Sequence, residues 1–469
     1  MALAWKRVSL RLLPFADAAS TELPLGRLLR LSLFQVSVGM ATVLLIGTLN
    51  RVMIVEMGVA AWLVSLMVAL PLVFAPFRAL IGFRSDMHKS VLGWKRVPYI
   101  WLGTWLQFGG LAIMPFALIL LSGDSHGPAW LGHAGAALAF LLVGAGVQTT
   151  QTAGLALASD LAPAHTRPRV VALMYVMLLA GMVTSGLVFG LLLADFSQLR
   201  LIKVVQGAAA VTMALNLIAL WKQEPRNRAA TDPARPRPGF RETWQRFAQT
   251  GRTQRFLVAL GLGTAAFQMQ DIILEPYGGE ILGMGVGATT VLTALMSVGA
   301  LCAFGLAAQR LGKGGDPHRL AALGVLAGMV AFSAVIFAEP LHSQALFRAG
   351  VVLIGFGGGL FSVGTLAAAM GLENQGLNGL ALGAWGAVQA SCSGAAIFAG
   401  GAVRDAVSGL ATQGALGSAL VNPATGYSFV YHIELGLMFA TLCAIGPLVR
   451  TRRAPSRSEP RFGLAEFPG

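Results

Sequence analysis

The sequence predicts an all-α polytopic membrane protein with twelve transmembrane helices, and three observations predict this class. The chain has 469 residues, a mean hydropathy of +0.69 and only 12% charged residues, whereas soluble domains carry about 25%. Apolar runs of about 20 residues, the length that crosses roughly 30 Å of hydrocarbon, recur from end to end. These runs lack the short alternating pattern of barrel strands, so the spans are expected to be helices.

Twelve apolar segments are expected to span the membrane, and they fall into two groups of six. The expected spans are 28–50, 58–81, 98–121, 130–156, 168–193, 199–221, 255–276, 286–308, 319–338, 344–370, 376–402 and 427–449. A hydrophilic, Pro-rich stretch separates the two groups. The expected units are therefore a cytoplasmic interfacial segment 1–27, a six-helix bundle 28–221, a cytoplasmic linker 222–254, a second six-helix bundle 255–449 and a cytoplasmic tail 450–469.

Glycine is abundant, with 58 residues in the chain. Within lipid, small residues allow helix backbones to approach one another closely. The four-residue spacing of Gly186 and Gly190, and that of Gly355 and Gly359, therefore predicts close helix–helix contacts along the fifth and tenth spans.

The net charge of +14 is distributed unevenly across the predicted membrane. With the N-terminus in the cytoplasm, 29 of the 34 Lys and Arg residues lie on the cytoplasmic side. Such a bias is the positive-inside signal, and it places both termini in the cytoplasm. Basic loops of this kind attract anionic lipid, so membrane lipids are expected partners and nucleic acid is not.

The two halves carry related turns after their second spans. Gly82-Phe-Arg-Ser-Asp86 follows the second span, and Gly305-Leu-Ala-Ala-Gln309-Arg310 follows the eighth, with Lys313 soon after. Two related groups of six spans joined by a cytoplasmic hinge resemble the major facilitator superfamily. That resemblance implies two six-helix bundles around a central cavity that opens alternately.

The turn after the second span is a candidate inner gate. Gly82 permits close packing, and the Asp86 carboxylate is able to cap a helix start and to pair with a base across the turn. The gate residues expected in the two halves are Gly82, Asp86, Lys89, Lys95, Arg96, Gly305, Arg310 and Lys313. The alternative is a solvated turn that only fixes the topology of the chain.

Five segments of the chain carry a narrower resemblance: 30–56, 84–118 (RSDMHKSVLGWKRVPYIWLGTWLQFGGLAIMPFAL), 148–163, 267–284 and 427–450. They resemble the PucC/LhaA family of phototrophic bacteria. The resemblance implies an assembly factor in the bacterial inner, intracytoplasmic photosynthetic membrane. It implies bacteriochlorophyll as cargo, and antenna polypeptides and reaction-centre/antenna assembly intermediates as partners. It implies no redox cofactor, and the sequence shows no catalytic motif.

Polar side chains at membrane depth are costly and are therefore candidates for function. The candidates are Arg51, Gln148, Gln151, Gln270, Asp271 and Glu275. Asp271 and Glu275 share a helix face until Pro276 intervenes. They form either an ion pair with Arg51, a proton or cation site, or a substrate contact. The glutamines of the fourth span either bind pigment or join helices to one another.

Candidate pigment contacts are His432, Trp101, Trp105 and Phe108. A neutral imidazole is a suitable axial ligand for the magnesium of a chlorin, and the three aromatic residues define one face of the third span. Packing and interfacial anchoring are the alternative uses of these side chains.

Three functions remain open from the sequence. The first is an antenna assembly factor that delivers bacteriochlorophyll or chaperones antenna polypeptides, as the family resemblance implies. The second is a proton-coupled transporter of a small solute, which the two-repeat plan and the pair Asp271 and Glu275 support. The third is a pigment-free assembly scaffold. None of the three is an enzyme.

Overall fold

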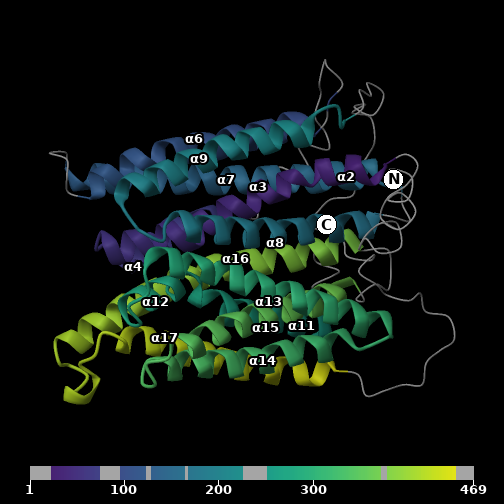
Figure 1. The fold of residues 1–469 in the computed structure, drawn as a ribbon. Coiled ribbons are helices and arrows are strands. Elements are labelled where there is room, and N and C mark those ends of the chain that lie inside the picture. Colours follow the sequence, from purple (N-terminus) through teal and green to yellow (C-terminus); the bar gives the residue numbers. More distant parts are fainter. Residues whose placement is uncertain are drawn as a thin grey trace, which may run out of the picture.

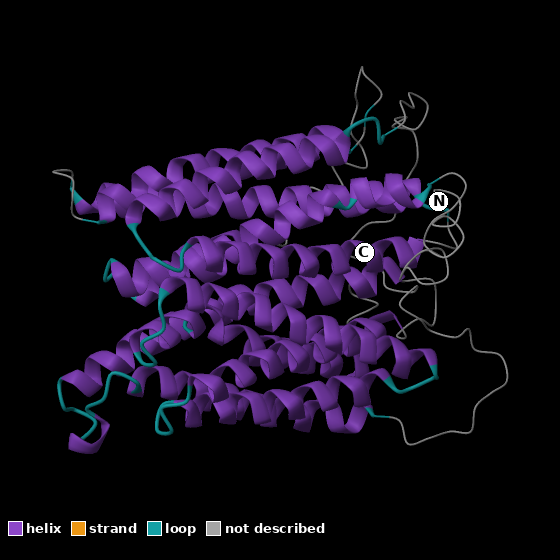
Figure 2. Ribbon diagram, in the orientation of Figure 1, coloured by secondary structure: helices purple, strands orange, loops and turns teal. Residues whose placement is uncertain are grey.

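The computed structural model describes residues 23–73, 94, 96–122, 128–163, 167–224, 251–370 and 378–449. Throughout these ranges the chain consists of helices and connecting loops, without a strand (Figure 2). Eleven helices of the described chain are long and apolar enough to cross a membrane. The expected second span is represented by a shorter apolar helix, and residues 74–81 of that span lie outside the described residues.

The first half of the chain forms one group of helices. Its elements are α2 (Leu25–Leu31), α3 (Leu33–Thr42), the π-helical segments η2 (Val43–Leu49) and η3 (Val52–Glu56), α4 (Ala61–Val73), α6 (Val97–Leu121), α7 (Ala129–Leu161), α8 (Arg167–Leu192) and α9 (Gln198–Leu220). The segments from α2 to η3 together make the first span, Leu25–Glu56.

The second half repeats this plan. Its elements are α11 (Gly251–Gln268), the 3-10 segment η5 (Met269–Ile272), α12 (Leu274–Glu280), α13 (Val286–Gly312), α14 (Pro317–Ala338), α15 (Gln344–Met370), α16 (Asn378–Thr412), η6 (Ser418–Leu420), α17 (Thr425–Ile445) and η7 (Gly446–Leu448). The segments from α11 to α12 make the seventh span. The expected linker 222–254 lies mostly outside the described residues, as do the terminal segments 1–22 and 450–469.

The two groups of helices lie side by side, with α2–α9 in the upper part of Figure 1 and α11–α17 in the lower part. Their main contacts are α8 with α13 and α4 with α16. These pairs are spans five and eight, and spans two and eleven, so exchanging the two halves converts one interface into the other. The predicted fold of two related six-helix bundles is confirmed.

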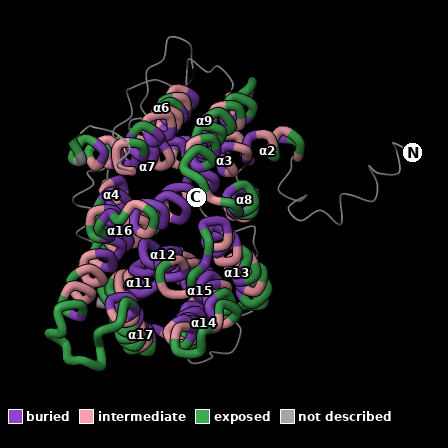
Figure 3. Tube along the Cα trace, turned by 60° about the vertical axis from the view of Figure 1, so that its left-hand side comes forward, coloured by how far each residue is buried: buried purple, intermediate pink, exposed green. Residues whose placement is uncertain are grey.

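Buried residues line the contacts between helices, and exposed residues cover the outside (Figure 3). Many large apolar side chains are exposed, among them Trp105, Phe116 and Leu191. A soluble protein rarely exposes contiguous apolar surface of this extent. The outer face is therefore suited to contact lipid, and the chain is a multi-pass membrane protein.

The glycine spacings do mark close contacts, as predicted. A Cβ built on Gly186 would lie 2.9 Å from the Cβ of Ala294, and one on Gly359 would lie 2.8 Å from the Cβ of Ala303. Gly355 lies against the backbone of Met296, where a Cβ would be 2.9 Å from the Met296 Cα. Glycine therefore allows α8 and α15 to pack directly on α13.

We predict that Gly355→Ala destabilises the protein by about 1–3 kcal/mol, because the added methyl group overpacks the α13–α15 contact. Its matched control is Gly436→Ala on α17, where nothing lies within 4 Å of the added Cβ. Thermal unfolding of both variants in detergent, followed by size-exclusion chromatography, measures the difference. Equal melting temperatures for the two variants would contradict the close approach.

Candidate functional site

The first span changes its helical winding halfway along. Its α-helical part, α3, ends at Thr42, and π-helical turns occupy Val43–Leu49 and Val52–Glu56. A π-turn widens the helix locally, re-aims the side chains that follow, and is frequent at functional sites. The side chains beyond Thr42 therefore do not point where a regular α-helix would place them.

The seventh span, which holds the place in the second half that the first span holds in the first half, is also interrupted. The helix α11 ends at Gln268, four residues adopt 3-10 geometry, and α12 resumes at Leu274. Pro276 has no N–H and so cannot donate a helical hydrogen bond. At membrane depth such a break is tolerated only where it is buried in protein or lines a cavity. All four residues of the break, Met269–Ile272, are buried.

The two irregular spans face each other. The side chain of Asn50 donates to the Asp271 carbonyl at 3.4 Å, across the contact between the halves. The hydroxyls of Thr48 and Thr290 lie 3.2 Å apart. The structure thus joins both interrupted segments and α13 into one buried polar region, which we call the central polar site.

The acidic residues of the seventh span lie within this site. The exposed fractions of Asp271 and Glu275 are 8% and 2%. Thr293 donates to Glu275 Oε1 at 2.6 Å, and Gln270 Nε2 donates to Asp271 Oδ1. Gly47 of the first span lies directly against the Glu275 carboxyl group, where a Cβ would collide with Oε1. Three predicted polar residues, Gln270, Asp271 and Glu275, are therefore brought together.

Arg51 does not make the ion pair that the sequence suggested. Its guanidinium pairs with Glu56, five residues further along, instead of with Asp271 or Glu275. It also donates to the Met284 carbonyl at 3.2 Å and lies against Gly279. The π-helical turns explain this correction, because they bring residues five apart onto one face of the helix.

A second polar cluster joins the two bundles and involves α4, α12, α16 and α17. Arg404 donates to Glu280, to Asp405 at 2.8 Å and to the Tyr427 hydroxyl at 2.9 Å. Asp405 also accepts from the backbone N–H of Trp62 in α4, at 2.8 Å. We call this cluster the Arg404 network. It links α4 of the first bundle to three helices of the second.

Amide side chains of the first bundle mainly join helices. Gln107 donates to Thr150 at 2.8 Å and so connects α6 to α7. Asn216 donates to Thr104 at 3.0 Å and accepts from Ser37 at 2.8 Å, which connects α9 to α6 and α3. Gln148 and Gln151 are half-buried on α7. Their role in pigment binding stays a prediction.

The candidate pigment contacts lie on outer faces. His432 is exposed, and its Nδ1 lies 2.7 Å from the Ser428 carbonyl of its own helix. Trp101, Trp105 and Phe108 form a row along α6, with ring centroids 6.4 and 6.0 Å apart. Trp105 is 58% exposed, whereas Trp101 and Phe108 are half-buried.

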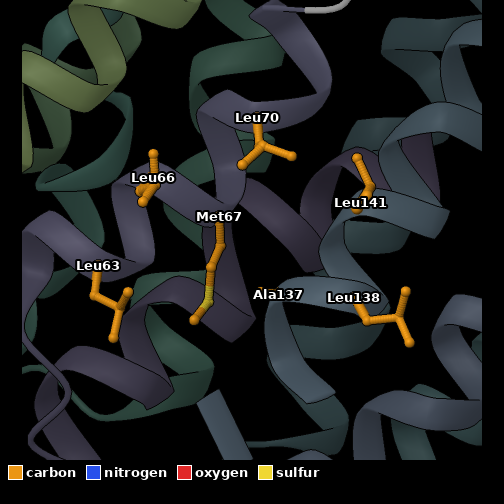
Figure 4. Close-up of a pocket in the computed structure, with 7 residues that line it drawn as sticks. All are labelled: Leu63, Leu66, Met67, Leu70, Ala137, Leu138 and Leu141. Carbon is orange, nitrogen blue, oxygen red and sulfur yellow. The ribbon is translucent and has the colours of Figure 1, made fainter. Parts of the chain in front are cut away.

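A shallow apolar groove lies between α4 and α7 (Figure 4). Its volume is about 170 Å³, below the 300–1,000 Å³ typical of small-molecule pockets. Leu66 and Leu138 are exposed, so the groove opens on the surface. The lining residues are Leu63, Leu66, Met67, Leu70, Ala137, Leu138 and Leu141.

The expected inner gate falls largely outside the described residues, which do not include Gly82, Asp86, Lys89 and Lys95. Arg96 is described, and its Nε donates to Asp160 at 2.9 Å within the first bundle. Gly305, Arg310 and Lys313 are exposed at the end of α13. The gate itself stays a prediction.

Solved structures with the same arrangement define the class of fold. The nucleoside transporter NupG covers 90% of this chain and all of its own, with a TM-score of 0.65 and 14% identity. A bacterial homologue of the lysosomal transporter Spinster, in an inward-facing conformation, gives the same TM-score and covers 90% of this chain and 95% of its own, at 14% identity. The fold is therefore that of the major facilitator superfamily.

Sequence comparisons then identify the family. The model of the PUCC protein family matches residues 48–453. Protein PucC of Rhodovulum sulfidophilum is 57% identical over 81% of this chain and 85% of its own. Protein PucC of Cereibacter sphaeroides is 52% identical over 96% and 98%, and an uncharacterized protein in the puhA-bchM intergenic region of Rhodobacter capsulatus is 54% identical over 97% of both chains. The chain belongs to the PucC family, and PucC is a protein related to the assembly of light-harvesting complexes.

Sequence reasoning missed the Arg404 network and the contact of Gly47 with Glu275. Arg404 stood out only as one of five basic residues on the expected outer side, and its partners lie up to 124 residues away along the chain. No local spacing signals such a contact. The one usable signal was the rarity of basic residues on the expected outer side, which holds five of the 34.

We predict that Arg404→Gln lowers stability by about 2–4 kcal/mol, because Glu280 and Asp405 lose a partly buried partner. The control is Arg348→Gln, which alters an exposed arginine on α15. Melting temperatures of the two purified variants in the same detergent measure the difference. If both melt like the parent protein, the Arg404 network does not hold the bundles together.

Proposed function

We propose that this chain is an assembly factor for a photosynthetic antenna complex, which delivers bacteriochlorophyll to antenna polypeptides or chaperones them in the membrane. The observation that carries the proposal is the family match over residues 48–453, together with PucC relatives of 52% and 57% identity. The family and the transporter-like fold are also typical of membrane proteins that catalyse no covalent chemistry.

The proposed location is the bacterial inner, intracytoplasmic photosynthetic membrane, with both termini in the cytoplasm. The charge bias of 29 basic residues to five supports this orientation. It places the Arg404 network and Glu56 toward the periplasm. In this orientation the network joins the two bundles on the periplasmic side.

The outer face supports delivery from within the lipid. Bacteriochlorophyll is a largely apolar molecule, so lateral entry from the bilayer costs less than passage through water. The aromatic row Trp101, Trp105 and Phe108 lies on α6 with Trp105 exposed, and an apolar groove lies between α4 and α7. We propose the row as the surface that contacts the pigment ring, with no ligand from His432.

A proton-coupled transporter is the second candidate. The facilitator fold and the buried carboxyl groups Asp271 and Glu275 favour it. It requires proton flux that depends on a solute, which the assembly proposal does not.

We predict that deletion of the gene removes one light-harvesting complex while bacteriochlorophyll synthesis continues, because the defect lies in assembly. Absorption spectra of membranes and pigment extracts measure the two quantities separately. Normal levels of every antenna complex in the deletion strain would overturn the proposed function. Solute-dependent proton flux in vesicles would instead favour the transporter.

We predict that protein purified in mild detergent carries bacteriochlorophyll, and that Trp105→Ala combined with Phe108→Ala lowers the bound pigment several-fold. The control is Trp130→Ala, which removes another exposed aromatic side chain, on α7. The ratio of pigment to protein absorbance measures the effect. A colourless protein that still holds antenna polypeptides would show a scaffold without a pigment site.

A further inference from the structure

Glu434 is a fully buried acid that the proposed function does not use. Its exposed fraction is 0%, and neither carboxyl oxygen has a hydrogen-bond partner within the described part of the chain. A buried polar group without a partner is costly, and a buried charge without one is costlier still. The position of Glu434 therefore requires a chemical explanation.

Glu434 lies beside the break in the seventh span. Its helix, α17, packs against η5. The carboxyl group lies near the backbone of Gln270 and near Asp271. The Gln270 side chain in turn donates to Asp271 Oδ1. Gln270 is thus a neighbour of both acids.

The Gln270 side chain independently indicates that a hydrogen-bond donor is missing from this cluster. Its exposed fraction is 0%, and its Oε1 atom has no donor among the residues that the structure describes. A carboxylate offers only acceptors, whereas a carboxylic acid offers one O–H donor. An added proton therefore provides the donor that this cluster of acceptors lacks.

The two arginine side chains near the site pair with other groups. Arg51 pairs with Glu56 and the Met284 carbonyl, and Arg404 pairs with Glu280 and Asp405. In the described ranges, no ion pair joins either arginine to Glu434 or Asp271. Among the side chains that the structure describes, the other titratable or charged groups on the elements packed against the break are Arg255, Glu275, Tyr277, Cys392, Tyr427, Tyr431, His432 and Cys443.

We propose that Glu434 and Asp271, with Gln270 as their common neighbour, form a proton-binding site at the break in the seventh span. Each carboxyl group takes one proton from water and forms one O–H bond, with no other reactant. In the described chain, no group of three His, Cys, Asp or Glu side chains is placed to hold a metal ion. Proton binding by these two acids does not depend on the binding of pigment. The proton-site proposal can therefore be tested independently of the proposed assembly function.

The test is infrared spectroscopy of the full chain in lipid nanodiscs at neutral pH. A protonated carboxylic acid gives a carbonyl stretch that a carboxylate lacks and that shifts in D2O. We expect this band in the parent protein, a smaller band in Glu434→Gln, and a still smaller one in Glu434→Gln combined with Asp271→Asn. The control, Asp195→Asn, removes a carboxyl group that is 89% exposed and leaves the band unchanged.

Two results would overturn the proposal. One is a band of equal amplitude in the parent and the double variant, or no band at all. The other is loss of the band when sodium is added at constant pH, which would show a site for a monovalent cation. If Glu434→Gln fails to fold, Asp271→Asn alone and the D2O shift of the parent protein decide the question.

Discussion

The central constraint on this molecule is that hydrocarbon provides no hydrogen bonds, so each polar group at membrane depth must find a partner within the protein. Regular helices satisfy their own backbones, but the first and seventh spans do not remain regular. Their breaks are tolerated because they face each other. Asn50 donates across the contact to the Asp271 carbonyl, and Thr293 of α13 donates to Glu275.

This constraint also explains where the two bundles touch. Helix association in lipid gains little from the hydrophobic effect and depends on close packing and polar contacts. Glycines supply the packing, as where Gly186 meets Ala294 and Gly401 meets Ser65. The Arg404 network supplies the polar contact between α4 and α16. The bundles are therefore joined by two small-residue interfaces and by a polar cluster at one end.

Much of the fold could be predicted from the sequence, because hydropathy and charge bias follow directly from the bilayer. Local sequence patterns were enough to predict the spans, the two halves and the close contacts at Gly355 and Gly359. The polar residues Asp271 and Glu275 were also found, since charge is rare within spans. Their surroundings were not, because the π-helical turns after Thr42 redirect Arg51 toward Glu56, and propensity does not reveal such turns.

The contact of Gly47 with Glu275 tests most directly whether the two interrupted spans meet. In a double-mutant cycle, Gly47→Ala should destabilise the protein because its methyl group collides with the Glu275 carboxyl. Glu275→Ala makes room for that methyl group. The combined variant should therefore lose less stability than the sum of the single variants, by about 1 kcal/mol or more. Strict additivity of the two melting-temperature shifts would contradict the facing arrangement of spans one and seven.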